Sequence, residues 1–417
     1  MKPVNEAYNT VLENTHTLKP KKAELKEASG RVVSENIFSP TDLPPFNQSA
    51  MDGYAVGPWH DSSDNGGHLK FSIKGEIKAG DNPDFHKLEA SEAIRIFTGT
   101  AIPKGTYTVV KQEDVKEENG FAHIPLSTVK ESYHIRKAGS HLKKGEKLVN
   151  EGTKVTPASL GLLASTGIAE VKVTPAPLIS IMVTGNELTF PGNPLQSGAI
   201  YESNGTMLRA AIEETPGRLY KEEYTGDSES ETKEKLKKLL DFPPNVILIT
   251  GGVSVGKYDL VRSGLDQLGV DIIFEKVAQK PGKPLVFGQK NNTLIFGLPG
   301  NPAAVLSCFY QYVYPAIRKM AGHANHDLPQ LQFPLGEAIT KKEGRATFMR
   351  IKIENGEVFP LKGQGSDNLM AFSKAHGLLK VPSDVTYREK GAEVTVSILP
   401  GNLESLIPNE ERAYEVT

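Results

Sequence analysis

Three apolar runs in the second half of the chain are each followed closely by a turn that contains glycine. The runs are 246–250, 272–274 and 293–296, and the turns are 251–256, 280–284 and 297–302. Short apolar runs of this kind predict buried strands. Glycine permits positive φ and close backbone approach, so such turns can point several N–H groups at one anion. Three of them on one sheet edge predict a pocket for a phosphate or another oxyanion.

The sequence around these turns predicts the fold class. Strand-like and helix-like patterns alternate from 177 to about 322, with a strand at 178–183 and helices at 204–214 and 228–240. Pro302 stands at a plausible first helical position, and a helix N-terminus also favours anions. Alternation at this period predicts a doubly wound, mostly parallel α/β domain whose ligands bind at the carboxyl ends of its strands.

The length of 417 residues is too great for one ordinary core, so we expect several domains. Short alternating runs separated by turn signals predict two further β domains, one inserted before the α/β domain and one after it. Thr156-Pro157 predicts the start of a helix. We expect a mixed helical and strand domain, used for dimerisation, at 1–40 and 143–175, an inserted β domain at 41–142, the α/β domain at 176–325, and a C-terminal β-barrel-like domain at 326–417.

Composition excludes several classes of protein. The 48 Lys and Arg residues nearly balance the 50 Asp and Glu residues, which argues against a nucleic-acid or membrane-surface binder. The single cysteine, Cys308, lies in an apolar helical run and is interpreted as a core residue. One cysteine cannot form a disulfide within the chain, which fits a reducing compartment. We therefore expect a soluble cytoplasmic protein.

Several polar residues of the α/β region have chemistry suited to a site. Glu187, just after the first strand, could bind a divalent cation or orient a water, although it could equally cap a turn. Asp259 follows the first glycine-bearing turn. Lys280 and Lys283 flank a Pro-Gly turn, and lysine is a compact charge suited to a tetrahedral oxyanion, although surface lysines are usually solvated.

Two candidates lie outside this region. Asp52 is surrounded by small and polar residues, but Asp-Gly is also a common turn. Arg350, which precedes the turn 363–366, could bind an oxyanion through two hydrogen bonds or could be a surface residue. The histidines have no zinc-site spacing. The segment 252–257 is one residue too short for a P-loop, and Tyr258 stands where a P-loop requires Ser or Thr.

Taken together, these segments resemble the molybdopterin molybdenumtransferases, the MoeA-type enzymes related to the E domain of gephyrin. The matching segments occur in the same order, at 49–55, 98–99, 184–188, 251–256, 280–284 and 297–302. The resemblance implies an L-shaped homodimer of four-domain chains, with a site formed where the α/β domain meets other domains across the dimer. It implies that molybdate replaces copper, if present, on the dithiolene of adenylylated molybdopterin, that AMP leaves, and that Mg²⁺ assists.

The resemblance also implies roles for individual residues. The catalytic positions are Asp52, Glu187, Asp227, Asp259, Lys280 and Lys283, of which Asp52, Glu187 and Asp259 also bind the metal. The molybdate positions are Lys280, Lys283, Pro284, Arg350 and Ser366. The pterin and nucleotide positions are Thr98, Gly99, Thr184, Gly251, Gly252, Ser254, Gly256, Pro299, Gly300, Asn301 and Pro302.

The chain departs from the family pattern at four positions where acidic residues are common, namely Asn47, His141, Asn186 and Lys257. We expect this loss of carboxylates to weaken a divalent-cation site. Two alternatives follow: a gephyrin-like non-catalytic scaffold that binds the pterin, or an enzyme with the same α/β core, such as the adenylyltransferase or a related nicotinamide-nucleotide deamidase. The two β domains argue against the second alternative, an enzyme with the same α/β core but different chemistry. Expected partners are the adenylyltransferase and the apoenzymes that accept the cofactor.

Overall fold

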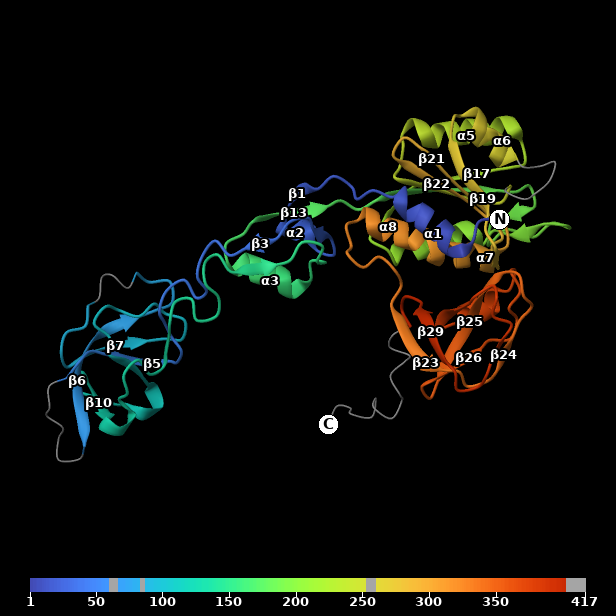
Figure 1. Cartoon of the computed structure of the whole chain (residues 1–417). Helices are drawn as coiled ribbons and strands as arrows, with labels where there is room; N and C mark the ends of the chain where they lie inside the picture. Colours follow the sequence, from blue (N-terminus) through green and yellow to red (C-terminus); the bar gives the residue numbers. More distant parts are fainter. Residues whose placement is uncertain (60–66, 83–86, 253–259, 403–417) are drawn as a thin grey trace.

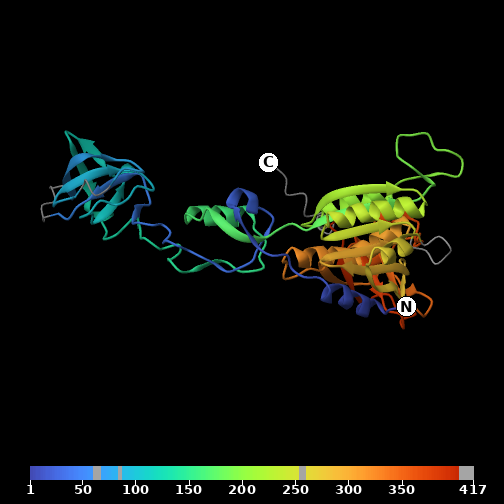
Figure 2. The same ribbon diagram turned by 90° about the horizontal axis from the view of Figure 1, so that it is seen from above.

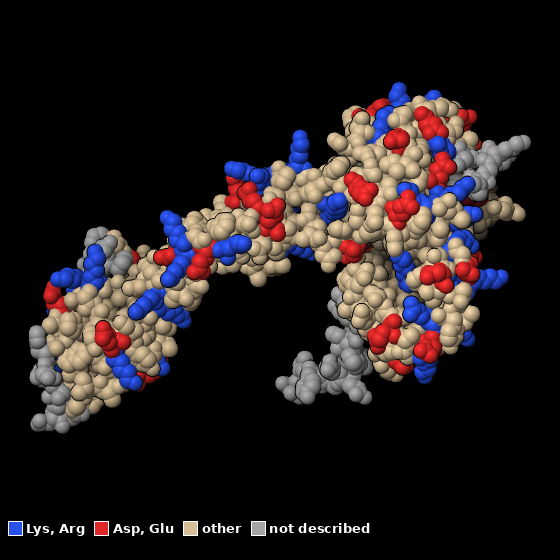
Figure 3. Space-filling view, in the orientation of Figure 1, with Lys and Arg blue, Asp and Glu red and all other residues tan. Residues whose placement is uncertain are grey.

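The computed structural model describes residues 1–59, 67–82, 87–252 and 260–402, which form a bent, elongated molecule (Figure 1). An α/β domain and the C-terminal β domain lie side by side at one end. A narrow arm leads from the α/β domain through a small middle domain to the inserted β domain at the far end (Figures 1 and 2). Lys and Arg are interspersed with Asp and Glu over the face shown in Figure 3, in keeping with the near-neutral net charge.

The α/β domain is built on a six-stranded sheet with the order β17-β14-β18-β22-β21-β19. The first four strands are mutually parallel, whereas β21 runs antiparallel to both β22 and β19. Its strands are β14 (Leu178–Thr184), β17 (Arg218–Thr225), β18 (Val246–Thr250), β19 (Asp271–Lys276), β21 (Pro284–Lys290) and β22 (Thr293–Leu298). A short parallel pair, β15 (Leu188–Thr189) and β16 (Ile200–Tyr201), stands apart from this sheet.

Helices cover both faces of this sheet, because alternate residues of each buried strand point to opposite sides. On one side, Met182 and Ile249 pack with Leu236 and Val261 from α5 and α6. The other side packs against α4, α7, η4 and α8. The helices are α4 (Asn204–Glu213), α5 (Glu229–Asp241), α6 (Leu260–Gln267), α7 (Pro302–Cys308), the π-helical η4 (Phe309–Val313) and α8 (Tyr314–Met320). The expected doubly wound α/β domain is confirmed.

The N-terminal helix α1 (Val4–Glu13) packs on the α/β domain. Its buried residues Val4, Ala7 and Val11 join the hydrophobic core that contains the α/β strands, and α1 contacts α8 and η4. This differs from the expected grouping of residues 1–40 with 143–175. An amphipathic pattern can indicate a helix but carries no information about which surface the apolar stripe of that helix will cover.

The middle and inserted domains form the arm. The middle domain has a three-stranded sheet and a second, two-stranded ribbon, and Thr156 caps α3 through the backbone N–H of Ser159. Its elements are β1 (Lys21–Glu24), α2 (Leu25–Ala28), β2 (Val32–Val33), β3 (Ile37–Phe38), β12 (Lys147–Val149), α3 (Pro157–Ser165) and β13 (Glu170–Thr174). The inserted domain has β4 (Gln48–Ser49), β5 (Gly53–Val56), β6 (His68–Ile77), β7 (Glu92–Ile96), β8 (Thr108–Lys111), η2 (Gln112–Asp114), β9 (Lys116–Glu118), β10 (Phe121–Pro125), η3 (Leu126–Thr128) and β11 (Ile135–Arg136).

The C-terminal domain is a sheet with the order β20-β25-β27-β29-β23, and β26 also pairs with β25. Its first strand, β20 (Gln279–Lys280), comes from within the α/β segment of the chain, so this sheet reaches the α/β domain. The other elements are β23 (Gln330–Pro334), β24 (Ile339–Thr340), β25 (Ala346–Glu354), β26 (Glu357–Pro360), α9 (Leu369–Ser373), β27 (Gly377–Val381), β28 (Tyr387–Arg388) and β29 (Glu393–Ile398). Ala346 and Phe348 belong to the same core as the α/β strands, so the two domains share buried surface.

Among the described residues, no helix is long and apolar enough to cross a membrane.

Candidate functional site

The carboxyl edge of the α/β sheet gathers the polar loops of this domain. The parallel strands β14, β17, β18 and β22 all end at this edge, and the loops that follow them carry Glu187, Asp227, Gly251 and Asn301 respectively. Because β21 runs antiparallel to β22, it begins at the same edge with Pro284, and the turn before it carries Lys280 and Lys283. Predicted site residues from five parts of the α/β segment therefore lie on one edge.

The Gly251-Gly252 turn sits tightly against the end of β14. Both glycines have positive φ, 83° and 63°, and a Cβ on Gly251 would stand 2.4 Å from the carbonyl oxygen of Thr184. No larger residue fits at Gly251 without a shift of backbone. Thr184 is buried, and its hydroxyl has no hydrogen-bond partner within the described part of the chain. That hydroxyl is therefore available to a ligand bound at the turn.

Asn204, which the sequence analysis treated only as the start of a helix, links two of the edge loops. Its side-chain amide nitrogen donates to the hydroxyl of Thr250 and to the carbonyl oxygen of Gly300, each at 2.8 Å. Thr250 ends β18 just before the glycine turn, and Gly300 lies in the loop before α7. The available signal was an asparagine, a residue that readily bonds nearby backbone, at the end of a loop between strand and helix.

The acidic loops of the edge are connected by Asn186, one of the four positions at which the resemblance implies an acidic residue. The backbone N–H of Asp227 donates to the side-chain oxygen of Asn186 at 3.0 Å. Asn186 thus holds the loop that carries Asp227 beside the loop that carries Glu187. Both carboxylates are exposed to solvent. The departure at Asn47 is also structural, since its side-chain oxygen accepts from the N–H of Ala138 at 2.8 Å.

The lysine turn, residues 280–283, joins two sheets. Lys280 lies on β20 opposite Thr347 of β25, whereas Pro284 begins β21 in the α/β sheet. Both lysine side chains are exposed. Gly282 between them has φ of 90°. The turn therefore presents two positive charges to solvent from a short backbone segment with one end in each domain.

Arg350 and Ser366 approach the same edge from the C-terminal domain. Arg350 is fully buried on β25, and its Nη2 donates to the carbonyl oxygens of Gly363 at 3.0 Å and Gly365 at 2.9 Å. Burial lowers the pKa of Arg350, and the nearby carboxylate of Asp367 acts in the opposite direction. Ser366, which follows Gly365, accepts a hydrogen bond of 2.7 Å from the side-chain amide of Asn301. Arg350 thus shapes the loop that touches the start of α7.

Asp52, Thr98 and Gly99 belong to the inserted domain. One carboxylate oxygen of Asp52 accepts from the backbone N–H of Thr98 at 2.8 Å and from its hydroxyl at 2.9 Å. These two hydrogen bonds, the backbone one first, hold the pKa of Asp52 below its usual value, so it is ionised at neutral pH. Asp52 directly precedes β5, and the middle domain separates β5 from β17 and β22 (Figure 1). Within one chain the structure does not bring Asp52 to Glu187.

Five residues named from the sequence lie outside the described residues, namely Ser254, Gly256, Lys257, Tyr258 and Asp259. Among the residues that are described, no group of three or more His, Cys, Asp or Glu side chains is arranged to hold a metal ion. The described acidic residues of the predicted metal set are Asp52 and Glu187, in different domains.

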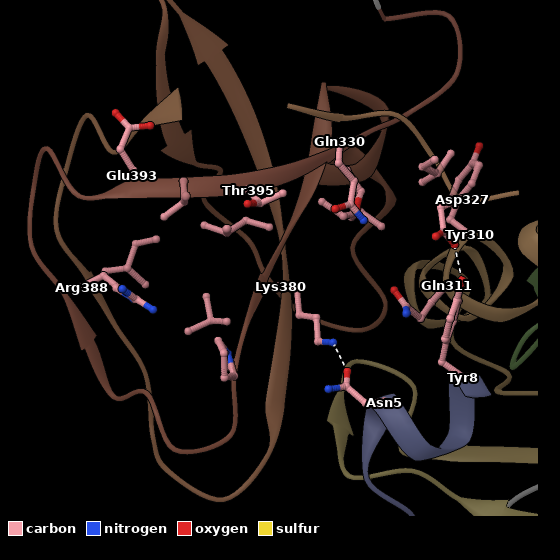
Figure 4. Close-up of a pocket in the computed structure, with 18 residues that line it drawn as sticks. Asn5, Tyr8, Tyr310, Gln311, Asp327, Gln330, Lys380, Arg388, Glu393 and Thr395 are labelled. Carbon is pink, nitrogen blue, oxygen red and sulfur yellow. Dashed lines mark hydrogen bonds between the residues drawn. The ribbon is translucent and has the colours of Figure 1, made fainter. Parts of the chain in front are cut away.

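Two hollows lie near the junction of the α/β and C-terminal domains. One, of about 480 Å³, lies between α1, η4 and the C-terminal strands, where Lys380 bonds Asn5 and Tyr8 bonds Asp327 (Figure 4). None of the predicted site residues lines this hollow or the one described next. The other, of about 750 Å³, has a largely apolar wall that includes Tyr310 and Phe372, and it also includes Glu202 and Ser203, which directly precede Asn204. This second hollow adjoins the carboxyl edge.

Comparison with known proteins assigns these domains to one family. Residues 2–167 match the MoeA N-terminal region (domains I and II), residues 180–319 match a probable molybdopterin binding domain, and residues 332–399 match the MoeA C-terminal region (domain IV). A molybdopterin molybdenumtransferase of Haemophilus influenzae is 37% identical over 391 residues, covering 91% of this chain and 93% of that protein.

Solved structures give the same result. Two crystal structures of the molybdopterin biosynthesis protein MoeA from Pyrococcus horikoshii cover 96% of this chain. One has a TM-score of 0.80 at 29% identity and covers 99% of that chain. The other has a TM-score of 0.75 at 30% identity and covers 100% of that chain. Matching sequence segments, family regions and fold over nearly the whole length place this chain in the molybdopterin molybdenumtransferase family.

Proposed function

We propose that this protein is a molybdenum insertase, which inserts molybdate into adenylylated molybdopterin and releases AMP in the last step of molybdenum cofactor synthesis. The observation that carries the proposal is the convergence, at one sheet edge, of the Gly251-Gly252 turn, the lysine turn and the Ser366 loop. Such a combination suits two substrates bound together, one that carries phosphates and one that is an oxyanion. The names of the similar proteins support this chemistry.

Molybdate is a tetrahedral dianion, and the lysine turn is suited to it. Lys280 and Lys283 supply two exposed ammonium groups on adjacent parts of one turn, which neutralise the charge of the oxyanion and fix its position. Ser366 offers a hydroxyl from the opposite domain, and Pro284 limits the backbone at the end of the turn. The fully buried Arg350 acts here by donating to the carbonyl oxygens of Gly363 and Gly365. These hydrogen bonds fix the loop on both sides of Gln364 and so the position of Ser366.

The pterin and the adenylate require room and hydrogen-bond donors. The Gly251-Gly252 turn and the loop of Pro299, Gly300, Asn301 and Pro302 would hold the phosphates, with the free hydroxyl of Thr184 beside them. The hollow of about 750 Å³ next to Asn204 has the size and apolar character of pockets for organic ligands. Ser254 and Gly256 are assigned to the same task on the resemblance alone.

The carboxylates of the edge fit a magnesium ion that keeps much of its water. Magnesium is commonly bound by one or two carboxylates together with substrate phosphates, and Glu187 and Asp227 are exposed oxygen donors on adjacent loops. Asp259, outside the described residues, is assigned to the same ion on the resemblance alone. Bound there, the ion would supply positive charge to the phosphoanhydride. The protein's own part is to hold the acidic loops together through Asn186, which stands where the resemblance implies an acidic residue.

Asp52, Thr98 and Gly99 require a second copy of the chain to reach this edge. We propose a homodimer in which the inserted domain of one subunit faces the sheet edge of the other, so that the partner subunit's Asp52 serves in metal binding and hydrolysis. Exposed apolar side chains near the edge, among them Phe190, Leu195 and Ile200, would be covered by such a contact. We place the protein in the cytoplasm, where the adenylyltransferase would deliver its substrate and apoenzymes would accept its product.

The test is incubation of the purified protein with adenylylated molybdopterin, Mg²⁺ and molybdate, following AMP release and the formation of active cofactor. Molybdate-dependent AMP release is the expected result, and Lys280→Ala should abolish it. The exposed Lys342, in the C-terminal domain, provides the matched control Lys342→Ala. Tight pterin binding without AMP release would instead indicate a scaffold, and adenylylation of free molybdopterin by ATP would indicate an adenylyltransferase. Either result would overturn the proposal.

A further inference from the structure

A buried polar network contacts the lysine turn on the side away from solvent. Gln279, the residue before Lys280, has no exposed surface. Its side-chain oxygen accepts a hydrogen bond of 2.5 Å from the hydroxyl of Tyr312. Its side-chain nitrogen donates to the carbonyl oxygen of Pro281 at 3.1 Å and to the sulfur of Cys308 at 3.5 Å. Every hydrogen-bonding atom of this amide therefore has a partner, and one partner is the backbone of the lysine turn itself.

The turn packs closely on this network. A Cβ added to Gly282 would stand 2.5 Å from the sulfur of Cys308 and 2.7 Å from the side-chain nitrogen of Gln279. At the base of the turn, the N–H of Val277 donates to the carbonyl oxygen of Lys283 at 3.0 Å. The backbone between the two lysines thus has little room to change its shape, because one side is closed by side chains and the base is closed by a hydrogen bond.

Tyr312 reaches Gln279 from an irregular part of the helix that follows the site. Residues 302–320 form a continuous helical stretch in which η4 (Phe309–Val313) is a π-helix between α7 and α8. A π-helical segment rotates the residues that follow it relative to a regular helix, and such segments are frequent at functional sites. Here Tyr312 lies within that segment, fully buried, with its hydroxyl on the amide of Gln279.

The network is electrically neutral. Burial raises the pKa of the Cys308 thiol to about 12 and raises the pKa of Tyr312 as well. Both groups are therefore protonated at neutral pH, and the tyrosine hydroxyl is a donor to the amide oxygen. A neutral, fully paired amide in a buried setting fixes geometry without a charge that would compete with the lysines for an anion.

We propose that Gln279, oriented by Tyr312, is a positioning residue that sets the spacing of the Lys280 and Lys283 ammonium groups for the oxyanion. It acts through the backbone of Pro281 and does not touch the substrate. This inference rests on the proposed role of the two lysines. It adds that the selectivity of the site for its oxyanion depends on side chains buried behind the turn, including the π-helical Tyr312.

Two variants test this. Tyr312→Phe removes one oxygen and leaves the Gln279 amide oxygen buried without its partner, and Gln279→Met keeps the side-chain length but removes all three hydrogen bonds. We expect Tyr312→Phe to raise the KM for molybdate about tenfold, the equivalent of one lost buried hydrogen bond, and Gln279→Met, which loses three, to raise it at least as much. The KM for adenylylated molybdopterin and the release of AMP at saturating molybdate should be unchanged. Matched controls are Tyr314→Phe, two residues along the same helical stretch, and Gln289→Met on β21, whose amide bonds only the carbonyl of Asn291.

Equilibrium dialysis of molybdate against the purified protein provides a readout that does not depend on turnover. If Lys280→Ala abolishes molybdate binding but Tyr312→Phe and Gln279→Met bind it as the wild type does, the positioning role is wrong and the proposed function stands. If Lys280→Ala itself leaves binding unchanged, the proposed function fails at its first step. If Gln279→Met does not fold, Tyr312→Phe decides, because it deletes a single atom. A loss of kcat with the KM for molybdate unchanged would also overturn the inference.

Discussion

The side-chain amide of Asn301 donates a hydrogen bond of 2.7 Å to the hydroxyl of Ser366, and this contact joins the loop before α7 to the C-terminal β domain. The backbone confirms the junction, because the N–H of Ala304 in α7 donates to the carbonyl oxygen of Ser366 at 3.1 Å. Two domains therefore meet at the residue to which the resemblance assigns molybdate contact.

Ser366→Ala should lower the rate of molybdenum insertion about fivefold to tenfold with little effect on stability, because one hydrogen bond of ordinary strength is lost at a half-exposed site. The measurement is kcat/KM for molybdate. Ser165→Ala on α3 is the control, since that exposed hydroxyl bonds the carbonyl oxygen of Leu162 in its own helix and lies in the middle domain. Equal effects of the two changes would contradict a role for Ser366 in the site.

Asn204→Asp should disorganise the edge while preserving the shape of the side chain. The variant loses the donor that reaches both Thr250 and Gly300, and it places a carboxylate against two oxygen atoms. We expect affinity for the adenylylated pterin to fall at least about tenfold, since the buried hydroxyl of Thr250 and the exposed carbonyl of Gly300 both lose their donor. Intrinsic pterin fluorescence on titration measures this. Unchanged affinity would mean that the two loops are held by other contacts.

Arg350→Lys should impair the use of molybdate more than it lowers the stability of the fold. Both hydrogen bonds to the carbonyls of Gly363 and Gly365 come from Nη2 at the far end of the arginine, which the shorter lysine does not reach, so the Ser366 loop should become less well ordered. We expect the KM for molybdate to rise by about a factor of ten and the thermal midpoint to fall by a few degrees at most. A fall in stability with normal kinetics would show that the arginine serves only the core.

Mixing two inactive variants tests whether the site is shared between subunits. Asp52→Asn and Lys280→Ala should each be inactive, and co-refolded mixed dimers should regain activity at about one quarter of all sites, because half the dimers are mixed and each has one intact site. The separately refolded proteins, combined without exchange of subunits, serve as the control. Activity that stays absent in verified mixed dimers would place both residues in the site of a single chain.

His323 should make the protein sensitive to mild acid. Burial, followed by the charges of Arg318 and Lys154, lowers its pKa from 6.5 to about 4. The folded state therefore holds this imidazole neutral, and the unfolded state binds its proton more readily. The contribution to stability is complete above pH 6.5 and is lost as the pH falls toward 4, by an amount on the order of 1–3 kcal/mol. His323→Gln should reduce the drop in thermal midpoint over this window, and His16→Gln, at an exposed position, should not.

Patterns with local causes were predicted from the sequence. The strand expected at 178–183 is β14, the capped helix after Thr156 is α3, and Pro302 occupies the first turn of α7. Each depends on periodicity or on a residue that favours a helix start, and both can be read along the chain. The family segments were recognised for the same reason, since each is a short contiguous stretch.

Features that depend on distant parts of the chain were not predicted. The pairing of β20 with β25, the double hydrogen bond of Asn204 and the placement of α1 on the α/β domain all join residues that are remote in sequence. Asn204 was noticed as a helix start because that is its local role, whereas its bridging role depends on loops after two other strands. The separation of Asp52 from the sheet edge depends on how the middle and inserted domains are arranged along the arm, which no local sequence pattern encodes.

The lysine turn begins in one sheet and ends in another, and this has a mechanical consequence. Because the turn packs on Gln279 and Cys308 and the two domains share buried surface, the gap between the two charges depends on the domains keeping their present angle. An oxyanion held by both lysines would act as a removable cross-link across that boundary. The protein should then be stiffest when loaded with molybdate, and the departure of the oxyanion into product would remove that cross-link while the shared core still holds the two domains together.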